Sequence, residues 1–513
     1  MKNKIYTLLI VLFFGFMISC DDFLDETPDN RTELDSGEKV RKLLVSAYPV
    51  ASYAYITEMM SDNSDESEGI GWESEILQEQ AYGWKDITSI DDDSPQIIWE
   101  QFYKAIASAN TALEAIREMG DPAELSAQKG EAMLCRAYGH FVLVNLFSKQ
   151  YGPSSASDMG IPYITEPETT VQPQYDRGTV AGVYELIEQD IEDGLPLINN
   201  TTYDVPKYHF NKTAAYAFAT RFYLYYQKYD KVIEYTNLVL GSNPLSVLRD
   251  WESLGMLTAN GNVQPDAYIN KDNPATLLLM PANSYWAYIH GPYTLGRRYG
   301  HNQYLSSTET VRAMTPWGNM TDIFRQGTFW NAQVNRIVVR KLGTYVEYTD
   351  QAAGIGYAHI VHPVFTTDEI LLCRAEAYIM QKSYDKALED INLFMTNFTY
   401  GSTVTSGDIS NYYGGMEYYT PEAPTQKKRL NPAFTIDPGT QENYVHCILN
   451  LRRLLTLHEG LRWFDIRRYG IEINRRIIGS RITVTDTMSK DDLRRTIQIP
   501  QDVIDAGLPA NPR

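Results

Sequence analysis

Apolar residues recur at steps of three and four along most of this chain, which is the spacing of an amphipathic helix. The clearest stripe runs from Ile98 to Ile116, after a suitable N-cap at Ser94 and a proline, Pro95, at the first helical position. Similar patterns predict further helices over residues 36–48, 125–147, 180–195, 213–226 and 444–469. The sequence therefore predicts a mostly α-helical fold.

Two of the helical stretches form an internal repeat. Arg221–Pro244 and Glu376–Thr399 both carry the tripeptide Tyr-Asp-Lys at the turn between two helices. Their residues fall at the offsets of a tetratricopeptide unit, in which paired helices pack closely and stack on the next pair. An ordinary amphipathic helical hairpin is the alternative, but it would not require the repeated tripeptide. We therefore expect tetratricopeptide-like helical pairs that form a right-handed superhelical scaffold.

The helical pattern is interrupted by stretches with the composition of loops. They are rich in Gly, Pro, Asn and aromatic residues and cover residues 50–93, 245–365 and 400–440. Within the longest of them, residues 277–280 and 336–340 have the apolar composition of short strands. We expect a single domain over residues 20–513, in which these inserts carry a few strands and the ligand-binding loops.

The first twenty residues have the features of an export signal. Lys2 and Lys4 precede an apolar stretch, residues 5–18, that is shorter than the roughly 20 apolar residues a membrane span needs. The stretch runs into the tetrapeptide MISC, which resembles a bacterial lipobox, in which the cysteine is acylated and becomes the mature N-terminus. A plain signal peptide with a chance cysteine is the alternative. We expect residues 1–19 to be removed and Cys20 to carry a lipid.

Composition and charge narrow the class of protein. The chain is 43% apolar and 21% charged, as in globular proteins, and its net charge of −20 argues against nucleic-acid binding, which needs clustered Lys and Arg. Acidic residues concentrate between Glu58 and Glu100, where Lys85 is the single base; such a run is usually a solvated face. The 37 tyrosines combine an apolar ring with a polar tip, which suits sugar or peptide contacts.

Motifs of metal sites and common enzyme classes are missing from the sequence. Cys135, Cys373 and Cys447 lie in helical patterns without a CxxC, so we expect buried thiols and not metal ligands. His359 and His362 have no third ligand nearby. GxSxG, P-loop and complete GxGxxG motifs are absent. The sequence thus predicts no metal, no cofactor and no catalytic residue.

Two other functions stay open on the residues alone. A surface glycoside hydrolase needs two carboxylates that flank the scissile bond. Among 65 acidic residues a pair such as Asp62 and Asp65 is inevitable, and nothing in the sequence selects it. A bare helical-repeat scaffold that binds another protein is the second alternative. That scaffold would not require the aromatic inserts, which favour the capture of a small ligand.

Six stretches, in order along the chain, resemble the motifs of one family. They are CDDFLDE from Cys20, IWEQFYKAI from Ile98, the pair EA at Glu131 with RAYGHF from Arg136, DEILLCRAEA from Asp368, EGLRWFDIRRYG from Glu459 and IPQ from Ile499. Together they span essentially the whole mature chain. The chain is similar to the SusD/RagB family, the outer-membrane nutrient-binding lipoproteins of Bacteroidota.

The resemblance implies a function and a location. A SusD/RagB protein captures a glycan, or in some members a peptide, outside the cell. It acts as the lid of a SusC-type TonB-dependent porin in the outer membrane, which imports the ligand. Asp21 and Asp22, directly after the anchoring cysteine, would suit export to the outer face. The resemblance therefore implies a surface-exposed, lipid-anchored binding protein and not an enzyme.

The stretch Glu459–Tyr469 combines acids, arginines and aromatic residues, yet we expect it to be structural. Glu459 and Arg462 are three residues apart on a predicted helix, as are Asp465 and Arg468, so both pairs are placed for ion pairing. Aromatic residues between them would pin the helix to its neighbours.

Aromatic residues in the loops are our candidates for ligand binding. A ring matches the apolar face of a pyranose while neighbouring polar groups bind its hydroxyls. The alternative for each is a core aromatic under a long loop. The predicted ligand-binding residues are Trp72, Trp84, Tyr285, Trp286, Tyr288 and Trp317. Trp99 and Tyr103 lie within a predicted helix pair, so we interpret them as packing residues.

Overall fold

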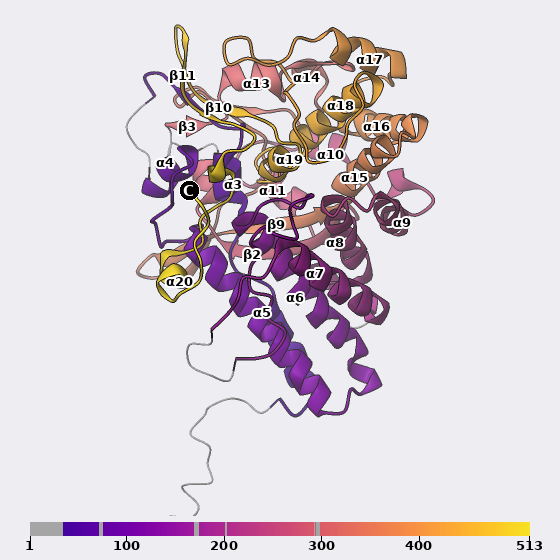
Figure 1. Cartoon of the computed structure of the whole chain (residues 1–513). Coiled ribbons are helices and arrows are strands. Elements are labelled where there is room, and N and C mark those ends of the chain that lie inside the picture. The colour runs from indigo at the N-terminus through magenta and orange to yellow at the C-terminus, as the bar shows by residue number, and fades with distance from the viewer. Residues whose placement is uncertain (1–33, 71–74, 169–173, 201–202, 292, 294–297) are drawn as a thin grey trace, which may run out of the picture.

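Helix α5 (Pro95–Glu118) begins where the sequence predicts, because Ser94 caps it. The Ser94 hydroxyl accepts a hydrogen bond from the backbone N–H of Ile97 at 3.3 Å. This bond satisfies one of the N–H groups that the first helical turn leaves unpaired. The predicted apolar stripe is buried from Ile98 to Ile116. Helix α5 is thereby fixed at one end of the scaffold (Figure 1).

The computed structural model describes residues 34–70, 75–168, 174–200, 203–291, 293 and 298–513. Its helices pack in chain order, α5 on α6, α6 on α7, α8 on α9, α9 on α15, and α15 on α16 and α18. Their bounds are α6 Ser126–Phe147, α7 Val180–Gly194, α8 Lys212–Tyr225, α9 Tyr229–Leu240, α15 Thr367–Met380, α16 Tyr384–Phe398 and α18 Thr440–Leu455. The predicted mostly α scaffold of helical pairs is confirmed.

The internal repeat is visible in the backbone as well as in the sequence. Helices α9 and α16 both begin at the tyrosine of the repeated tripeptide, Tyr229 and Tyr384. Two residues earlier, Gln227 (φ 62°) and Lys382 (φ 59°) both adopt the left-handed conformation that non-glycine residues rarely take. The two helical pairs therefore turn in the same way, as stacked repeats require.

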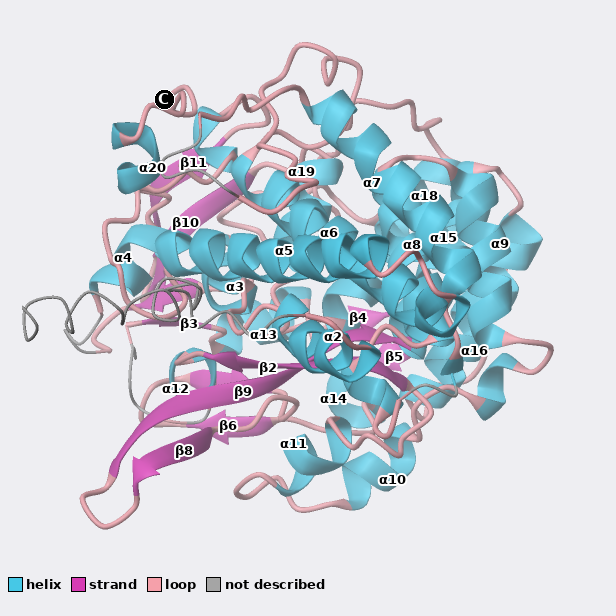
Figure 2. Ribbon diagram, turned by 90° about the horizontal axis from the view of Figure 1, so that it is seen from below, coloured by secondary structure: helices cyan, strands magenta, loops and turns pink. Residues whose placement is uncertain are grey.

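Most of the described strands lie in the inserts, and both predicted strands form. Residues 277–280 lie in β2 (Thr276–Asn283) and residues 336–338 form β7, which pairs with β6. Strand β2 pairs with β9, and β9 with β8, all antiparallel; Figure 2 shows β8 and β9 extending away from the helices. A four-stranded sheet has the order β11-β10-β1-β3. The strand bounds are β1 Asp65–Ser67, β3 Tyr299–Gly300, β6 Phe329–Asn331, β7 Arg336–Val338, β8 Tyr345–Asp350, β9 Ile355–Thr366, β10 Ile473–Ile478 and β11 Ile482–Met488.

The first insert is more regular than its composition predicts. It contains α3 (Ala54–Met60) and α4 (Ile76–Tyr82) within residues 50–93. All seven residues of α3 are buried, including Thr57 and Glu58, so the helix has no solvent-exposed face and leaves no periodic signal in the sequence. The last insert likewise contains a helix, α17 (Ser406–Gly415), which begins with a capping box.

The long helix predicted over residues 444–469 is two helices. Helix α18 ends at Leu455, and α19 (Arg462–Arg468) follows after a turn. Gly460 lies in that turn with φ 77°, and a side chain there would meet the Thr57 hydroxyl and the backbone of Ala54. Because the helix is interrupted here, the backbone at Gly460 can approach α3 closely.

Shorter elements complete the described part of the chain. They are α2 Gly37–Leu44, α10 Trp251–Met256, α11 Val263–Tyr268, α12 Trp286–Ile289, α13 Gln303–Glu309, α14 Met320–Ile323, α20 Gln501–Asp505, β4 Met314–Thr315 and β5 Gly318–Asn319. The thiols of Cys135, Cys373 and Cys447 are free and buried, as predicted. Among the described helices, none combines the length and apolarity that a membrane crossing needs.

Candidate functional site

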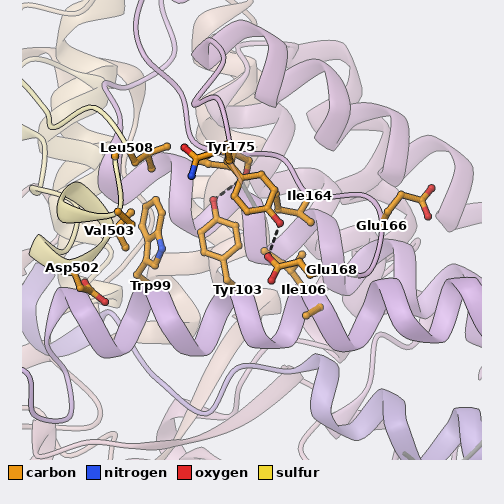
Figure 3. A pocket seen from close by; sticks show the side chains of 15 residues that line it. Trp99, Tyr103, Ile106, Ile164, Glu166, Glu168, Tyr175, Asp502, Val503 and Leu508 are labelled. Carbon is orange, nitrogen blue, oxygen red and sulfur yellow. Dashed lines mark hydrogen bonds between the residues drawn. The ribbon is translucent and has the colours of Figure 1, made fainter. Parts of the chain in front are cut away.

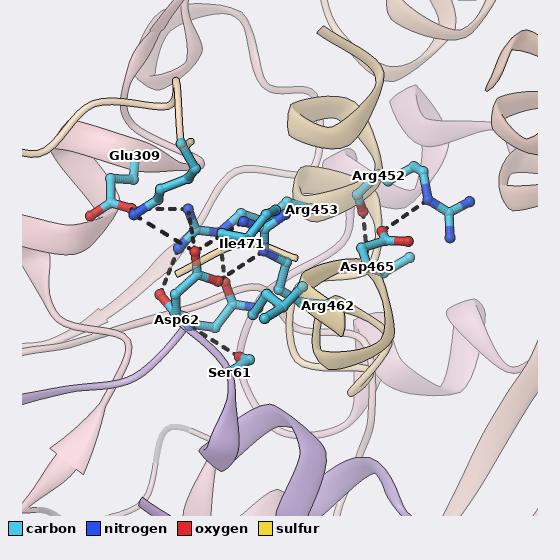
Figure 4. A network of polar contacts seen from close by, with 12 residues as sticks. Ser61, Asp62, Glu309, Arg452, Arg453, Arg462, Asp465 and Ile471 are labelled. Atoms are coloured by element: carbon cyan, nitrogen blue, oxygen red, sulfur yellow. Dashed lines mark hydrogen bonds and ion pairs between the residues drawn. The ribbon is translucent and has the colours of Figure 1, made fainter. Parts of the chain in front are cut away.

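The acidic pair Asp62 and Asp65 is buried in ion pairs. Figure 4 shows the contacts of Asp62. Arg462 binds Asp62 through two bonds of 2.8 and 3.0 Å, and Arg476 binds Asp65 at 2.5 Å. Burial alone would raise the pKa of Asp62, but the guanidinium groups of Arg453 and Arg462 outweigh it and hold that pKa well below its usual range. The Asp62 carboxylate is therefore held as an ion inside the core and is not a candidate proton donor.

The stretch that begins at Glu459 is structural, as predicted, although one of its pairs differs. Arg468 lies 3.1 Å from Asp465, which confirms that ion pair. Glu459 does not pair with Arg462; its carboxylate is 3.1 Å from the buried ammonium group of Lys341. Helical spacing predicts pairs only between residues that are close in the sequence, whereas Glu459 pairs with a lysine more than a hundred residues away.

Three of the predicted ligand-binding tryptophans are core residues. Trp84, Trp286 and Trp317 are 2%, 1% and 7% exposed. The Trp84 indole N–H donates to the carbonyl of Met60 at 2.8 Å, and that of Trp317 faces the Asn392 side-chain oxygen at 3.4 Å. Because their rings pack beneath the loops that carry them, the prediction that they stack on a ligand is corrected. Two further predicted positions, Cys20 and Trp72, lie outside the described residues.

Two predicted residues, Tyr285 and Tyr288, are accessible and form a row with Tyr293. The ring centroids of Tyr285 and Tyr288 are 6.3 Å apart, and those of Tyr288 and Tyr293 are 5.4 Å apart. Tyr285 and Tyr293 are 42% and 40% exposed, and Tyr288 is half-buried. We call these three residues the tyrosine ladder. Its spacing places successive rings where they can be covered by one extended ligand.

The ladder is held in place by Asp93. After β2 ends, the Ser284 hydroxyl donates to one Asp93 oxygen at 2.6 Å and the backbone N–H of Tyr285 donates to the other at 2.8 Å. Trp286, the first residue of α12, is buried directly behind them. Asp93 immediately precedes Ser94, the cap of α5. The Tyr285 end of the ladder is thus tied to the helical scaffold through a buried carboxyl group, while Arg336 donates to the Tyr293 carbonyl at the other end.

An acidic cleft adjoins the ladder. It has a volume of about 950 Å³ and is lined by Tyr285 together with Glu75, Asp91, Asp92 and Asp93 among its polar residues. Burial, followed by the charge of Asp91, raises the pKa values of Glu75 and Asp92. The described residues that line the cleft include no Lys, Arg or His. The cleft therefore offers hydrogen-bond acceptors beside an aromatic ring and disfavours anions.

Asp93 itself is fully buried and has an unusual pKa. Burial raises the pKa of Asp93 to about 7, against the hydrogen bonds from Ser284 and Tyr285, which favour the ionised form. Neither Asp93 nor Tyr293 is among the predicted site residues. The three acidic residues Asp91–Asp93, directly before the cap of α5, are the sequence feature that could have indicated the cleft. An acidic run alone, however, more often marks a solvated face.

Trp99 and Tyr103 do pack in the helical core, as predicted, but they also reach a surface cavity. The Trp99 ring meets Phe147 edge to face, with centroids 5.1 Å apart. The same two residues line a cavity of about 320 Å³ between α5 and α20 (Figure 3). Helical spacing shows which face of a helix is apolar, but not whether another segment fully covers that face.

Searches against families and curated proteins find SusD-like relatives. Residues 22–224 match the SusD-like family model described as "Starch-binding associating with outer membrane". Over 271 residues the chain is 25% identical to "SusD-like protein P38" of Formosa agariphila, a match that covers 49% of each protein. The chain thus matches about half the length of this curated relative.

Solved structures extend the likeness to nearly the whole chain. A SusD superfamily protein from Bacteroides thetaiotaomicron is similar with a TM-score of 0.62 at 19% identity, covering 94% of this chain and 100% of the other. A putative sugar binding protein from Bacteroides vulgatus gives a TM-score of 0.66 at 17% identity, covering 94% and 99%. At these identities the likeness establishes a shared fold.

Proposed function

We propose, from the likeness of this chain to SusD-like proteins, that it belongs to that family and binds carbohydrate at the bacterial outer membrane. The observation that carries the proposal is the tyrosine ladder beside the acidic cleft. Ring faces of tyrosine suit the apolar face of a sugar, and carboxylates accept hydrogen bonds from its hydroxyls. Because no basic side chain lines the described cleft, a neutral glycan fits better than an acidic one.

We further propose how the protein is held and what it serves. Cys20 in its lipobox-like setting would carry the lipid that anchors the chain to the outer membrane, facing outwards. A SusC-type TonB-dependent transporter would receive the captured ligand, which is the family's role. Replacing the thiol in Cys20→Ser should move the protein from the membrane fraction to the soluble one. Retention of the variant in the membrane would contradict lipid anchoring.

We propose binding and not hydrolysis as the role of the cleft. Asp93, with its raised pKa of about 7, is the group that most resembles a general acid. Its carboxyl is completely buried, and both oxygens accept bonds from Ser284 and Tyr285. A proton donor must reach the glycosidic oxygen. The geometry therefore supports Asp93 as a positioning residue for the ladder.

Calorimetry with a panel of polysaccharides and peptides tests the proposal on residues 21–513. We expect saturable binding of one glycan class, weakened roughly two- to tenfold in Tyr285→Ala or Tyr288→Ala, because each removes one ring contact. Tyr348→Ala is the matched control, since Tyr348 is 54% exposed on β8 and belongs neither to the ladder nor to the residues that line the cleft.

Each outcome of the panel has a distinct meaning. Binding that is unaffected by both ladder variants would place the ligand elsewhere and overturn the assigned site. A peptide as the sole ligand would replace carbohydrate in the proposal. Cleavage of a glycan during the measurement would favour the glycoside hydrolase. No detectable binding of any ligand in the panel would overturn carbohydrate capture.

A further inference from the structure

The aromatic cavity of Figure 3 is separate from the cleft. It lies where α5 faces Gln174–Tyr175 and the segment from Asp502 to Leu508, and it shares no lining residue with the acidic cleft. Its rings are those of Trp99, Tyr103 and Tyr175. At about 320 Å³ it is near the lower limit of small-molecule sites, so it suits a compact group.

The rings offer the cavity their carbon faces and edges. The Tyr103 hydroxyl donates to the carbonyl of Pro162 at 2.8 Å, and the Tyr175 hydroxyl donates to Glu168 at 2.5 Å. Both phenol groups therefore already have protein partners. Trp99 and Tyr103 stand at 52° to each other with centroids 4.9 Å apart, so their faces form an angled wall. Such a wall attracts a cation through the negative potential of the ring faces.

Carboxylates, and no cations, accompany the rings. Glu168 lies beside Tyr175, and Asp502 lies at the opposite end near Trp99 (Figure 3). Glu166 turns away from the rings and is 3.5 Å from Arg117. The described lining residues include no Lys, Arg or His. The local charge is therefore negative, which complements a positive ligand.

Apart from Gln174, the remaining side chains that line the cavity are apolar, and this favours an alkylated cation over a sugar. Ile106, Ile164, Val503 and Leu508 supply aliphatic surface. A sugar ring would bury several hydroxyl groups here with few partners, which is unfavourable. A quaternary ammonium group needs no hydrogen bonds, its methyl groups match the aliphatic walls, and its charge meets the rings and carboxylates.

We propose that the aromatic cavity binds a quaternary ammonium group, such as the trimethylammonium head of choline. The site is independent of the carbohydrate proposal, because it uses other residues and other chemistry. Trp99, Tyr103 and Tyr175 contact the methyl groups, while Glu168 and Asp502 balance the charge. Helix α5 contributes to both sites but by different residues, Ile97 to the cleft and Trp99 to the cavity.

Titration of the full chain with choline tests the proposal, with its neutral isostere 3,3-dimethyl-1-butanol as the paired probe. The two molecules have the same shape and differ in charge. We expect choline to bind saturably and roughly tenfold more tightly than the alcohol, within the range of cation–π interactions. Tyr175→Ala and Glu168→Gln should each weaken choline binding severalfold, while Tyr348→Ala should leave it unchanged.

The variants are chosen to keep the fold intact. Tyr175 is 38% exposed and Glu168 is exposed, so neither substitution empties the core, as Trp99→Ala would. Equal binding of choline and the alcohol would show an apolar cavity without cation selectivity and overturn the proposal. Binding of a monosaccharide that is lost in Tyr175→Ala would assign the cavity to a sugar. Absence of saturation at millimolar choline would also overturn it, whether or not glycans bind at the ladder.

Discussion

Asp93 shows how one buried carboxyl group can organise a surface site. Its two oxygens hold Ser284 and Tyr285, while its own backbone leads directly into the cap of α5. Burying a carboxyl group favours its neutral form, and the pKa of about 7 reflects that penalty. The tyrosine ladder is therefore positioned by a group whose charge changes near neutral pH.

Asp93→Asn should make stability less dependent on pH between about 4 and 7. In that window the folded chain holds a proton on Asp93 that the unfolded chain has released, so the free energy of unfolding falls as pH rises. The slope contributed is at most about 1.4 kcal/mol per pH unit, and asparagine removes it. Urea unfolding of both proteins at several pH values measures the difference. Asp193→Asn, at an exposed position, is the control; parallel curves for the Asp93 variant would contradict the shifted pKa.

At single positions, the sequence gives the residue type but not how deeply its side chain is buried. Tyr285 and Tyr288 were predicted from the same loop composition as Trp84 and Trp317, yet the tyrosines are accessible and the tryptophans are buried. A large indole gains more by burial than a phenol, whose hydroxyl must find a partner or water. Other loop aromatics do not follow this difference, since Trp330 is 50% exposed and Tyr82 is 5% exposed, so tertiary contacts that composition does not reveal decide the depth of each ring.

At the scale of elements, capping signals were more reliable than periodicity. Ser94 and Pro95 located the start of α5, whereas α3 was missed because all its residues are buried. The long helix predicted over residues 444–469 failed for the opposite reason, since its periodicity continues through the turn at Gly460. Local signals predict an element well when it has one solvent face, and poorly when tertiary contacts surround it.

Ser94→Ala should lower the free energy of unfolding by about 1 kcal/mol, within a range of roughly 0.5–2. The substitution removes the acceptor for the Ile97 N–H and leaves the first turn of α5 with an unpaired donor. Ser108→Ala on the same helix is the matched control, because Ser108 is half-buried in mid-helix, where its hydroxyl donates to the Lys104 carbonyl, and alanine is the better helix former. Urea unfolding compares the two variants. Equal losses would show that the cap contributes nothing specific.

At the scale of the whole molecule, buried charges join segments that lie far apart in the chain. Asp62 follows α3 near the start, while Arg453 and Arg462 belong to α18 and α19 near the end. Strands β1 and β10 bring the same two regions together in one sheet. The helical repeats were predictable because their pairing is local. The sheet was not, since β1 has three residues and its parallel partner is about four hundred positions away.

Asp62→Asn should therefore destabilise the whole fold and not one element. It leaves the buried charges of Arg453, Arg462 and Lys428 with one carboxylate fewer, and removing one member of a buried pair typically costs about 3–5 kcal/mol. Asp121→Asn is the control, because its pair with Lys129 is half-exposed and such pairs contribute less than about 1 kcal/mol. Urea unfolding followed by both tryptophan fluorescence and circular dichroism measures the loss. Coincident transitions at a much lower urea concentration are expected, since the network joins both ends of the chain. A loss no larger than that of the control would mean that packing around α3 and α19, and not ion pairing, holds the two ends together.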